Sequence, residues 1–179
     1  MSIDWEKIAR EVGGLSADGC EQVAGTVGAR RALELIIGEQ NIREAVDWCA
    51  DERPGAFTAE MVLRILSSTV AMNRCYEIYK TEPGSHRAGT AVFLLYEMAD
   101  YRILPWIREF IEDESHTIRW NGLMALSPIL SGPVNDDHIA LAKELLSKAE
   151  SDSDDRIRDQ AAKIRQRLKS DPSLRYLNL

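Results

Sequence analysis

The feature that most constrains the fold of this chain is a pair of apolar helical segments that recurs about every 30 residues. The pattern is clearest in residues 83–132, where Ser85 precedes one apolar segment and Ser115 precedes another. A serine at such a place accepts hydrogen bonds from the unpaired amides of a helix's first turn. A shorter helical segment, Ile103–Ile111, lies between the two. The stretch therefore predicts helices that pack as hairpins.

Turns and arginines recur with a similar spacing along the chain. Pro54-Gly55 lies 29 residues before Pro83-Gly84, and Arg87 lies 32 residues before Arg119. Apolar triplets also occupy matching places: Leu33, Ile36 and Ile37, then Val62, Ile65 and Leu66, then Ala91, Leu94 and Leu95. A period of this length filled by two helices is typical of an α-solenoid.

Helical periodicity predicts about ten helices and no strand, because no segment alternates with a period of two. The expected helices are Ile3–Val12, Asp18–Val27, Ala29–Ile37, Ile42–Ala50 capped by Asn41, Phe57–Val70, Met72–Lys80, 85–99, 103–111, 115–130, a helix capped by Asp136 or Asp137 and ending near Ala149, and Arg156–Lys169. Within Phe57–Val70 we expect Met61, Val62, Ile65 and Leu66 to point inward.

Two aspartate–arginine pairs have the same spacing across a helix start, namely Asp113/Arg119 and Asp152/Arg158. With this spacing, residues 40–170 resemble the HEAT-like repeat family. The resemblance implies an all-α fold, a right-handed α-solenoid of about five helical hairpins. It also implies that these four residues form a ladder of hydrogen bonds between adjacent repeats. Earlier units differ: Thr81 precedes Arg87 at the aspartate position with Glu82 beside it, and Ala29 and Thr58 occupy the arginine position.

The expected organisation is one repeat domain over residues 1–179. Residues 1–40 form N-terminal capping helices and a divergent repeat, 41–132 the central repeats, 133–170 the last hairpin and 171–179 a tail. We expect the apolar residues of that tail to dock on the final hairpin; they are Leu174, Tyr176 and Leu177.

The formal net charge of −7 is unevenly distributed. Residues 1–132 hold 20 acidic and 13 basic side chains, whereas residues 133–179 hold nine of each. An acidic surface repels phosphate backbones and attracts basic proteins. The charge therefore predicts a basic protein partner and no nucleic acid.

Cys20, Cys49 and Cys75 are widely spaced, and each lies in a helix-like segment. This pattern predicts buried, reduced thiols and a cytoplasmic location. The first residues, MSIDWEKIAR, indicate no secretory signal. No apolar run approaches the ~20 residues that span a bilayer, so no membrane partner is expected.

Candidate catalytic and metal-binding residues have simpler structural explanations. His86, His116 and His138 lie near successive helix starts and form no HxxxH or HxxE pair. Residues 112–114 can hold a cation, but a solvated turn is favoured. Residues 151–155 lack calcium-loop spacing and suit a helix start. We therefore expect no catalytic residue, no metal and no cofactor.

A predicted binding surface combines an aromatic anchor, a flexible filler and a charged rim, as protein interfaces do. Trp120 and Met124 share one side of the 115–130 helix, and Tyr96 lies near the equivalent row of the preceding helix. The rim consists of Glu97, Asp100 and Glu114. An alternative is that Trp120 packs between repeats.

These observations favour a non-enzymatic protein-binding module that is monomeric when unbound. Small acidic proteins of the HEAT-like family resemble bacterial immunity proteins, which neutralise a nuclease-type toxin by direct binding. An acidic surface would match the basic cleft of such a toxin domain. The alternative is a HEAT-like repeat enzyme or accessory protein, such as a DNA-repair glycosylase relative or a lyase adaptor. A toxin gene next to this one would decide for the immunity protein.

Overall fold

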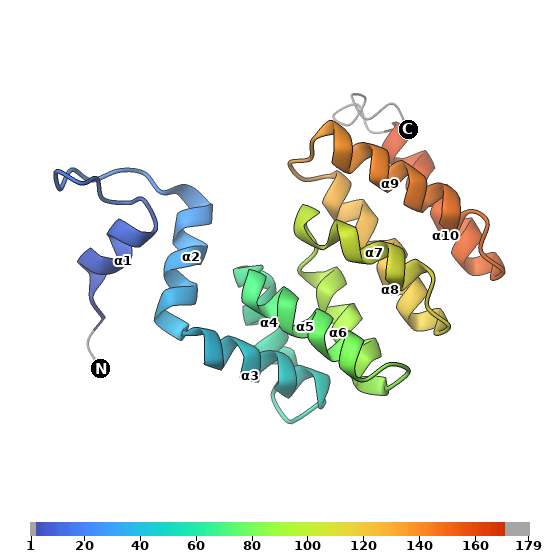
Figure 1. The fold of residues 1–179 in the computed structure, drawn as a ribbon, viewed down its shortest axis with the longest axis horizontal. Coiled ribbons are helices and arrows are strands. Elements are labelled where there is room, and N and C mark those ends of the chain that lie inside the picture. Colours follow the sequence, from blue (N-terminus) through green and yellow to red (C-terminus); the bar gives the residue numbers. More distant parts are fainter. Residues whose placement is uncertain (1–2, 171–179) are drawn as a thin grey trace. The chain divides into compact units, whose positions relative to one another are not determined.

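A computed structural model describes residues 3–170, and these are helical without β-strands, which confirms the all-α prediction (Figure 1). One isolated bridge joins Leu15 and Glu21. The predicted docking residues Leu174, Tyr176 and Leu177 lie outside the described residues. The elements are α1 (Trp5–Glu11), α2 (Gly25–Ile37), α3 (Glu39–Ala50), α4 (Ala56–Leu66), α5 (Thr69–Thr81), α6 (His86–Glu97), the 3-10 helix η1 (Tyr101–Ile103), α7 (Leu104–Ile111), α8 (His116–Leu130), α9 (Asp136–Ala149) and α10 (Asp155–Ser170).

The chain divides into two compact units, one ending at Arg74 and the other beginning at Cys75. The single domain expected over residues 1–179 stays a prediction. In the first unit, α3 packs against α4, and α2 contacts both. The buried side chains of this packing include Ile42, Val46, Leu63 and Leu66. These helices present the site described below.

In the second unit the helices form two rows, one of α6, α8 and α10 and the other of α7 and α9. The helix α8 contacts α6 on one side and α10 on the other, while α7 contacts α9 (Figure 1). The consecutive helices α7 and α8 also pack against each other, as do α9 and α10. Gly122 allows the close approach of α7 and α8, because a Cβ at this position would lie 2.6 Å from the Cβ of Phe110.

The helix predicted over Asp18–Val27 is wrong. Residues 18–24 instead form a turn and an irregular segment that lead into α2, which begins at Gly25. Gly19 and Gly25 have φ angles of +84° and +64°, which place them outside the helical region. Cys20 is exposed in this turn, so the predicted burial holds for Cys49 and Cys75 only.

The single helix predicted over Phe57–Val70 is also wrong. Ser67 adopts a left-handed conformation (φ 42°, ψ 47°) that ends α4 at Leu66. The hydroxyl of Ser68 then accepts a hydrogen bond from the amide of Val70 (3.1 Å) at the start of α5. The sequence shows no glycine or proline at this break, which is why periodicity alone runs the two helices together.

Three predicted helix caps also differ from the structure. Asn41 lies inside α3, where its side-chain amide donates to the carbonyl of Ile37 (2.6 Å). Asn135, rather than Asp136 or Asp137, caps α9. The Ser115 side chain makes no capping hydrogen bond, whereas Ser85 accepts from the amide of Ala88 as expected. No helix within residues 3–170 is long and apolar enough to cross a membrane.

Candidate functional site

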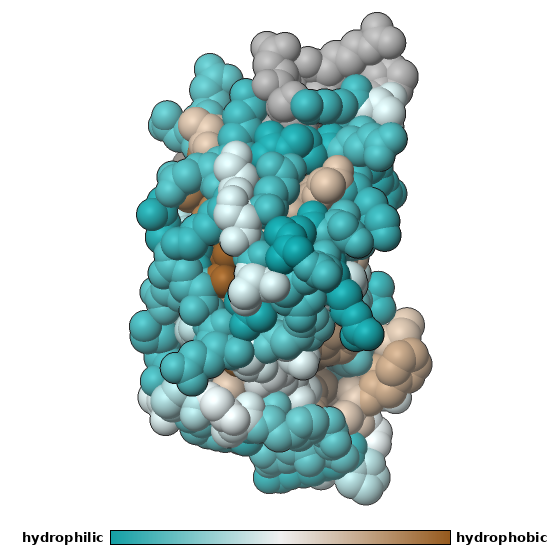
Figure 2. Space-filling model, turned by 90° about the vertical axis from the view of Figure 1, so that its right-hand side faces the viewer, coloured by the Kyte–Doolittle hydropathy of each residue, from teal (hydrophilic) through white to brown (hydrophobic). Residues whose placement is uncertain are grey.

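The first unit carries nearly all of the large apolar side chains that the described residues expose. Ten of the eleven belong to it, and Tyr101 is the exception in the second unit. The face shown in Figure 2 is largely hydrophilic, with apolar residues in small separate areas. A concentration of exposed apolar side chains marks an interaction surface. The ten residues are Ile3, Trp5, Val23, Val27, Leu33, Trp48, Phe57, Met61, Val62 and Ile65.

The helix α4 accounts for four of these residues. Phe57, Met61 and Ile65 recur every four residues and therefore share one side of the helix, with Val62 next to them. Their exposed fractions are 70%, 46%, 61% and 43%, respectively. The inward orientation predicted for Met61, Val62 and Ile65 is thus wrong, while that of Leu66 is confirmed.

The physical reason is that α4 is apolar on most of its circumference, whereas the first unit covers only one arc of it. Leu63 and Leu66 occupy that arc and are 1% and 3% exposed. A helix that is apolar on all sides is normally covered on all sides. The outer side of α4 is therefore an uncovered apolar face.

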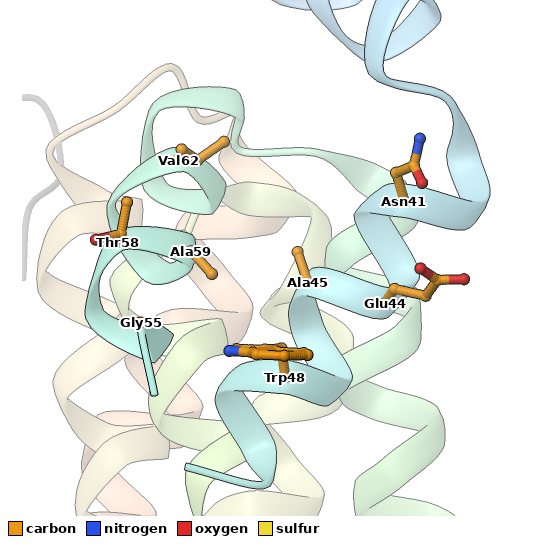
Figure 3. Close-up of a pocket in the computed structure, with 8 residues that line it drawn as sticks. All are labelled: Asn41, Glu44, Ala45, Trp48, Gly55, Thr58, Ala59 and Val62. Atoms are coloured by element: carbon orange, nitrogen blue, oxygen red, sulfur yellow. The ribbon is translucent and has the colours of Figure 1, made fainter. Parts of the chain in front are cut away.

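A shallow groove of about 380 Å³ lies between α3 and α4. Small residues, including Ala45 and Ala59, leave room between the helices, and Trp48 lies near the Gly55 end (Figure 3). The indole nitrogen of Trp48 donates to the carbonyl of Pro54 (2.9 Å), and the Arg53 guanidinium lies 5.1 Å from the ring centroid. These contacts hold the ring in place. The lining residues are Asn41, Glu44, Ala45, Trp48, Gly55, Thr58, Ala59 and Val62.

The surroundings of this groove are acidic. Residues 39–66 contain six acidic and three basic side chains. Arg53 pairs with Asp51, and Arg64 lies 3.8 Å from Glu60. Glu44 accepts a hydrogen bond from Gln40 (2.9 Å), and within residues 3–170 no cation lies at ion-pair distance from it. The side-chain charge that a binding partner would meet at this groove is therefore negative.

The groove offers no activated nucleophile. Cys49, which is buried on α3, donates its thiol proton to the carbonyl of Ala56 (Sγ–O 3.3 Å). Burial, together with the nearby Glu60 carboxylate, raises the pKa of the Cys49 thiol to about 11. A thiol with such a pKa stays protonated at neutral pH and is inert.

The structure places the predicted binding residues Tyr96, Trp120 and Met124 in separate surroundings, all half-buried. The Tyr96 ring lies 6.2 Å from that of Phe93 on the same helix, and the Trp120 ring lies 6.2 Å from that of His116. The Met124 sulfur accepts from the side-chain amide of Gln160 (3.2 Å). Within residues 3–170, the rings of Tyr96 and Trp120 do not contact each other.

The predicted rim residues also differ from one another. Asp100 pairs with Arg102 and caps η1 through the Arg102 amide (2.9 Å). Glu114 is exposed, and Glu97 is half-buried at the end of α6. The binding role of these three residues and of Tyr96, Trp120 and Met124 stays a prediction.

Arg119 joins two consecutive turns of the second unit. Its Nε donates to the Asp152 carboxylate (3.0 Å), and its Nη1 donates to the backbone carbonyl of Asp113 (3.0 Å). The Arg119 and Asp152 side chains are 15% and 7% exposed. Arg158 repeats half of this arrangement, since its Nη1 donates to the carbonyl of Asp152 (2.7 Å). The arginine side chain thus reaches the aspartate of the following turn.

The aspartates of these turns also accept hydrogen bonds from the chain that follows them. Asp113 accepts from the amide of Ser115 (2.8 Å), and Asp152 accepts from that of Asp154 (2.8 Å). The second carboxylate oxygen of Asp113 accepts from the hydroxyl of Tyr79 (3.1 Å). Each carboxylate therefore ties its own turn to the preceding helices.

Sequence reasoning missed an aromatic and charged cluster between α5 and α7. The rings of Tyr76 and Trp106 stack with centroids 4.3 Å apart. The Tyr76 hydroxyl donates to Glu109 (2.7 Å), as does the Lys80 ammonium (2.8 Å), and these two bonds hold the pKa of Glu109 below its usual value. Burial and the Glu109 carboxylate raise the pKa of Tyr76 to about 12. These partners satisfy one another, which indicates a structural clamp.

The three histidines occupy helix starts. His138 and Asn135 form a reciprocal capping box, and the His138 ring stacks on Tyr101 at 5.2 Å. The Nε2 atom of His116 lies 3.4 Å from the Asp154 carboxylate, and His86 is exposed. The pKa of Asp154 is lowered, first by the hydrogen bond from the Arg156 amide and then by His116. Residues 3–170 contain no group of three His, Cys, Asp or Glu side chains placed to hold a metal ion.

This chain matches no protein-family model, and searches of the curated proteins and of the solved structures find no similar protein. Its function must therefore be inferred from the site itself.

Proposed function

We propose that this chain is a non-enzymatic protein-binding module. The observation that carries the proposal is the uncovered apolar face of α4, formed by Phe57, Met61, Val62 and Ile65, beside the groove that contains Trp48. Rigid aromatic and apolar side chains in a partly formed groove are the usual anchors of a protein interface. Burying this face against a partner would stabilise both surfaces.

The partner is a basic protein. The net charge of −7 and the excess of acidic side chains around the groove support this part of the proposal, because complementary charge speeds association and excludes acidic competitors. A bacterial immunity protein that neutralises a nuclease-type toxin in the cytoplasm fits this chemistry, since it must mask a basic cleft. The helical pairs then belong to a right-handed HEAT-like solenoid of about five hairpins, monomeric when unbound.

The test is to purify the tagged chain from its native host, identify co-purified proteins by mass spectrometry and repeat the binding with both purified proteins. We expect a basic partner that binds in a stable ratio. If that partner is a nuclease, adding this chain should stop its activity. Turnover of a small molecule, altered by changes at acidic residues, would instead indicate an enzyme.

The two candidate surfaces can be separated with the same partner. If the residues around Trp120 form the interface, Trp120→Ala should weaken binding by at least ~2 kcal/mol through faster dissociation. If the α4 face forms the interface, Phe57→Ser should do so and Trp120→Ala should have no effect. Surface plasmon resonance gives both rate constants, and equal melting temperatures would show that the variants fold.

A further inference from the structure

We propose that the α3–α4 face receives a basic amphipathic α-helix of the partner protein. The inference rests on the proposed function and deepens it by assigning the site and the kind of segment that occupies it.

The first argument is the shape of the uncovered face. Phe57, Met61 and Ile65 form a stripe along α4 that rises about 12 Å at 1.5 Å per residue. An amphipathic helix places its anchors at i, i+4 and i+7, which span about 10 Å. The stripe and such a helix therefore match in length, and a helix laid beside α4 would cover the arc that α3 leaves uncovered.

The second argument is the groove next to the stripe. Val62 lines the groove and lies next to the stripe, and small side chains such as Ala45 and Ala59 leave room there for one large apolar side chain (Figure 3). Trp48 closes off part of this space with a ring that is fixed by Pro54 and Arg53. A leucine or an aromatic residue of the incoming helix would contact the face of this ring.

The third argument is charge. Glu44 lines the groove without a cationic partner in residues 3–170, and residues 39–66 hold twice as many acidic as basic side chains. Lysines or arginines flanking the apolar stripe of the incoming helix would lie against this acidic margin. The same charge disfavours a second copy of this chain and an anionic lipid surface as occupants.

A labelled synthetic peptide provides the test. The peptide has about 18 residues, which is five helical turns, with leucines on one side and lysines elsewhere. A control peptide has the same composition, shuffled so that no apolar side exists. Fluorescence anisotropy should show the wild-type chain binding the amphipathic peptide about tenfold more tightly than the shuffled one. Equal binding of the two peptides would overturn the inference.

Two variants that add the same charge locate the site. Val62→Glu places a carboxylate on the face, whereas Val23→Glu places one at a side chain that is 98% exposed and lies outside α3 and α4. Both carboxylates attract the lysines, so only the loss of apolar contact can weaken binding. We expect Val62→Glu to weaken binding about tenfold and Val23→Glu not to weaken it. Phe57→Ser should repeat the loss without a charge, and equal effects of the two Glu variants would overturn the assignment.

Further measurements distinguish the remaining possible occupants of the face. A dimer in light scattering that Val62→Glu dissolves would assign the face to a second copy and overturn the inference. Sedimentation of the chain with zwitterionic lipid vesicles would assign the face to a membrane surface and would also overturn the inference. Suppose that Val62→Glu weakens binding of a native partner but the chain does not distinguish the two peptides. The proposed function would then hold, and the inference that the bound segment is an amphipathic helix would be wrong. If the peptides bind as expected but no native partner is found, the assignment of the binding face would hold and the proposed function would be wrong.

Discussion

Arg119 connects two turns of the second unit through a well-shielded ion pair with Asp152, whose side chain is 7% exposed. Removing one partner of a buried pair typically costs ~3–5 kcal/mol, while an exposed pair contributes under ~1 kcal/mol. We expect Arg119→Ala to lower the free energy of unfolding by about 1–3 kcal/mol in urea titrations. Arg108→Ala is the matched control, because Arg108 joins α7 to Glu144 of α9 with side chains 48% and 56% exposed.

Equal losses in the two arginine variants would mean that burial does not distinguish these pairs. Asp113 gives an independent check on the ladder, because its carboxylate bonds both the Ser115 amide and the Tyr79 hydroxyl. A melting temperature unchanged by Asp113→Ala would mean that the resemblance to HEAT-like repeats is one of spacing only.

The raised pKa of Tyr76 predicts that the stability of the fold depends on pH in the alkaline range. Its pKa is raised from 10.0 to about 12 by burial and by Glu109, so the protonated hydroxyl is favoured in the folded state. A raised pKa means that the contribution of Tyr76 to stability is complete below pH 10 and is lost as the pH rises toward 12. Titration of tyrosinate absorbance should show this late ionisation. The Tyr76→Phe variant should lose one late-ionising hydroxyl and keep that of Tyr79, whose pKa is also raised by burial and by Asp113. Ionisation of all tyrosines near pH 10 would contradict the clamp.

At the scale of elements, α7 and α8 depend on a glycine that permits their close packing. A Cβ at Gly122 would lie 2.6 Å from the Cβ of Phe110, whereas a Cβ at Gly89 in α6 would meet no atom within 4 Å. We expect Gly122→Ala to destabilise the chain by about 1–3 kcal/mol through overpacking. Gly89→Ala should stabilise it by up to ~1 kcal/mol, because alanine is the better helix former. Urea unfolding measures both, and the same sign for both would contradict the close approach.

The N-terminal caps of α6 and α8 show which helix starts the sequence predicts well. Ser85 caps α6 as its position indicates, because its hydroxyl reaches the Ala88 amide within the first turn. Ser115 has the same local sequence context, but its side chain makes no cap bond, and its backbone amide donates to the Asp113 carboxylate.

For the whole molecule, the net charge of −7 predicts how a basic partner should approach. Reversing an exposed charge such as Glu114 to lysine should slow association and weaken its dependence on salt, because exposed charges outside the apolar contact steer the encounter more than they hold the complex. We expect the same direction for Glu97→Lys, and dissociation should change little in either variant. Stopped-flow measurements with the purified partner at low and physiological salt test this, and an unchanged association rate would place the steering charges elsewhere.

The sequence alone determines that this chain is helical and where most of its helices lie. Apolar residues at helical spacing, the Pro-Gly turns and the capping Ser85 are local signals, and they depend on interactions within a few residues. The equal spacing of Asp113/Arg119 and Asp152/Arg158 is also visible without a structure, whereas the bond from Arg119 to Asp152 is seen only in the fold.

Only the tertiary structure decides which apolar side of a helix is covered. Met61, Val62 and Ile65 have the spacing of core residues, yet they are exposed because Leu63 and Leu66 occupy the one arc that the first unit can bury. The stacked pair of Tyr76 and Trp106 likewise joins residues 30 positions apart, which no local pattern predicts. A helix that is apolar on all sides contains no signal for which side faces its neighbours, since that choice depends on the position of the other helices.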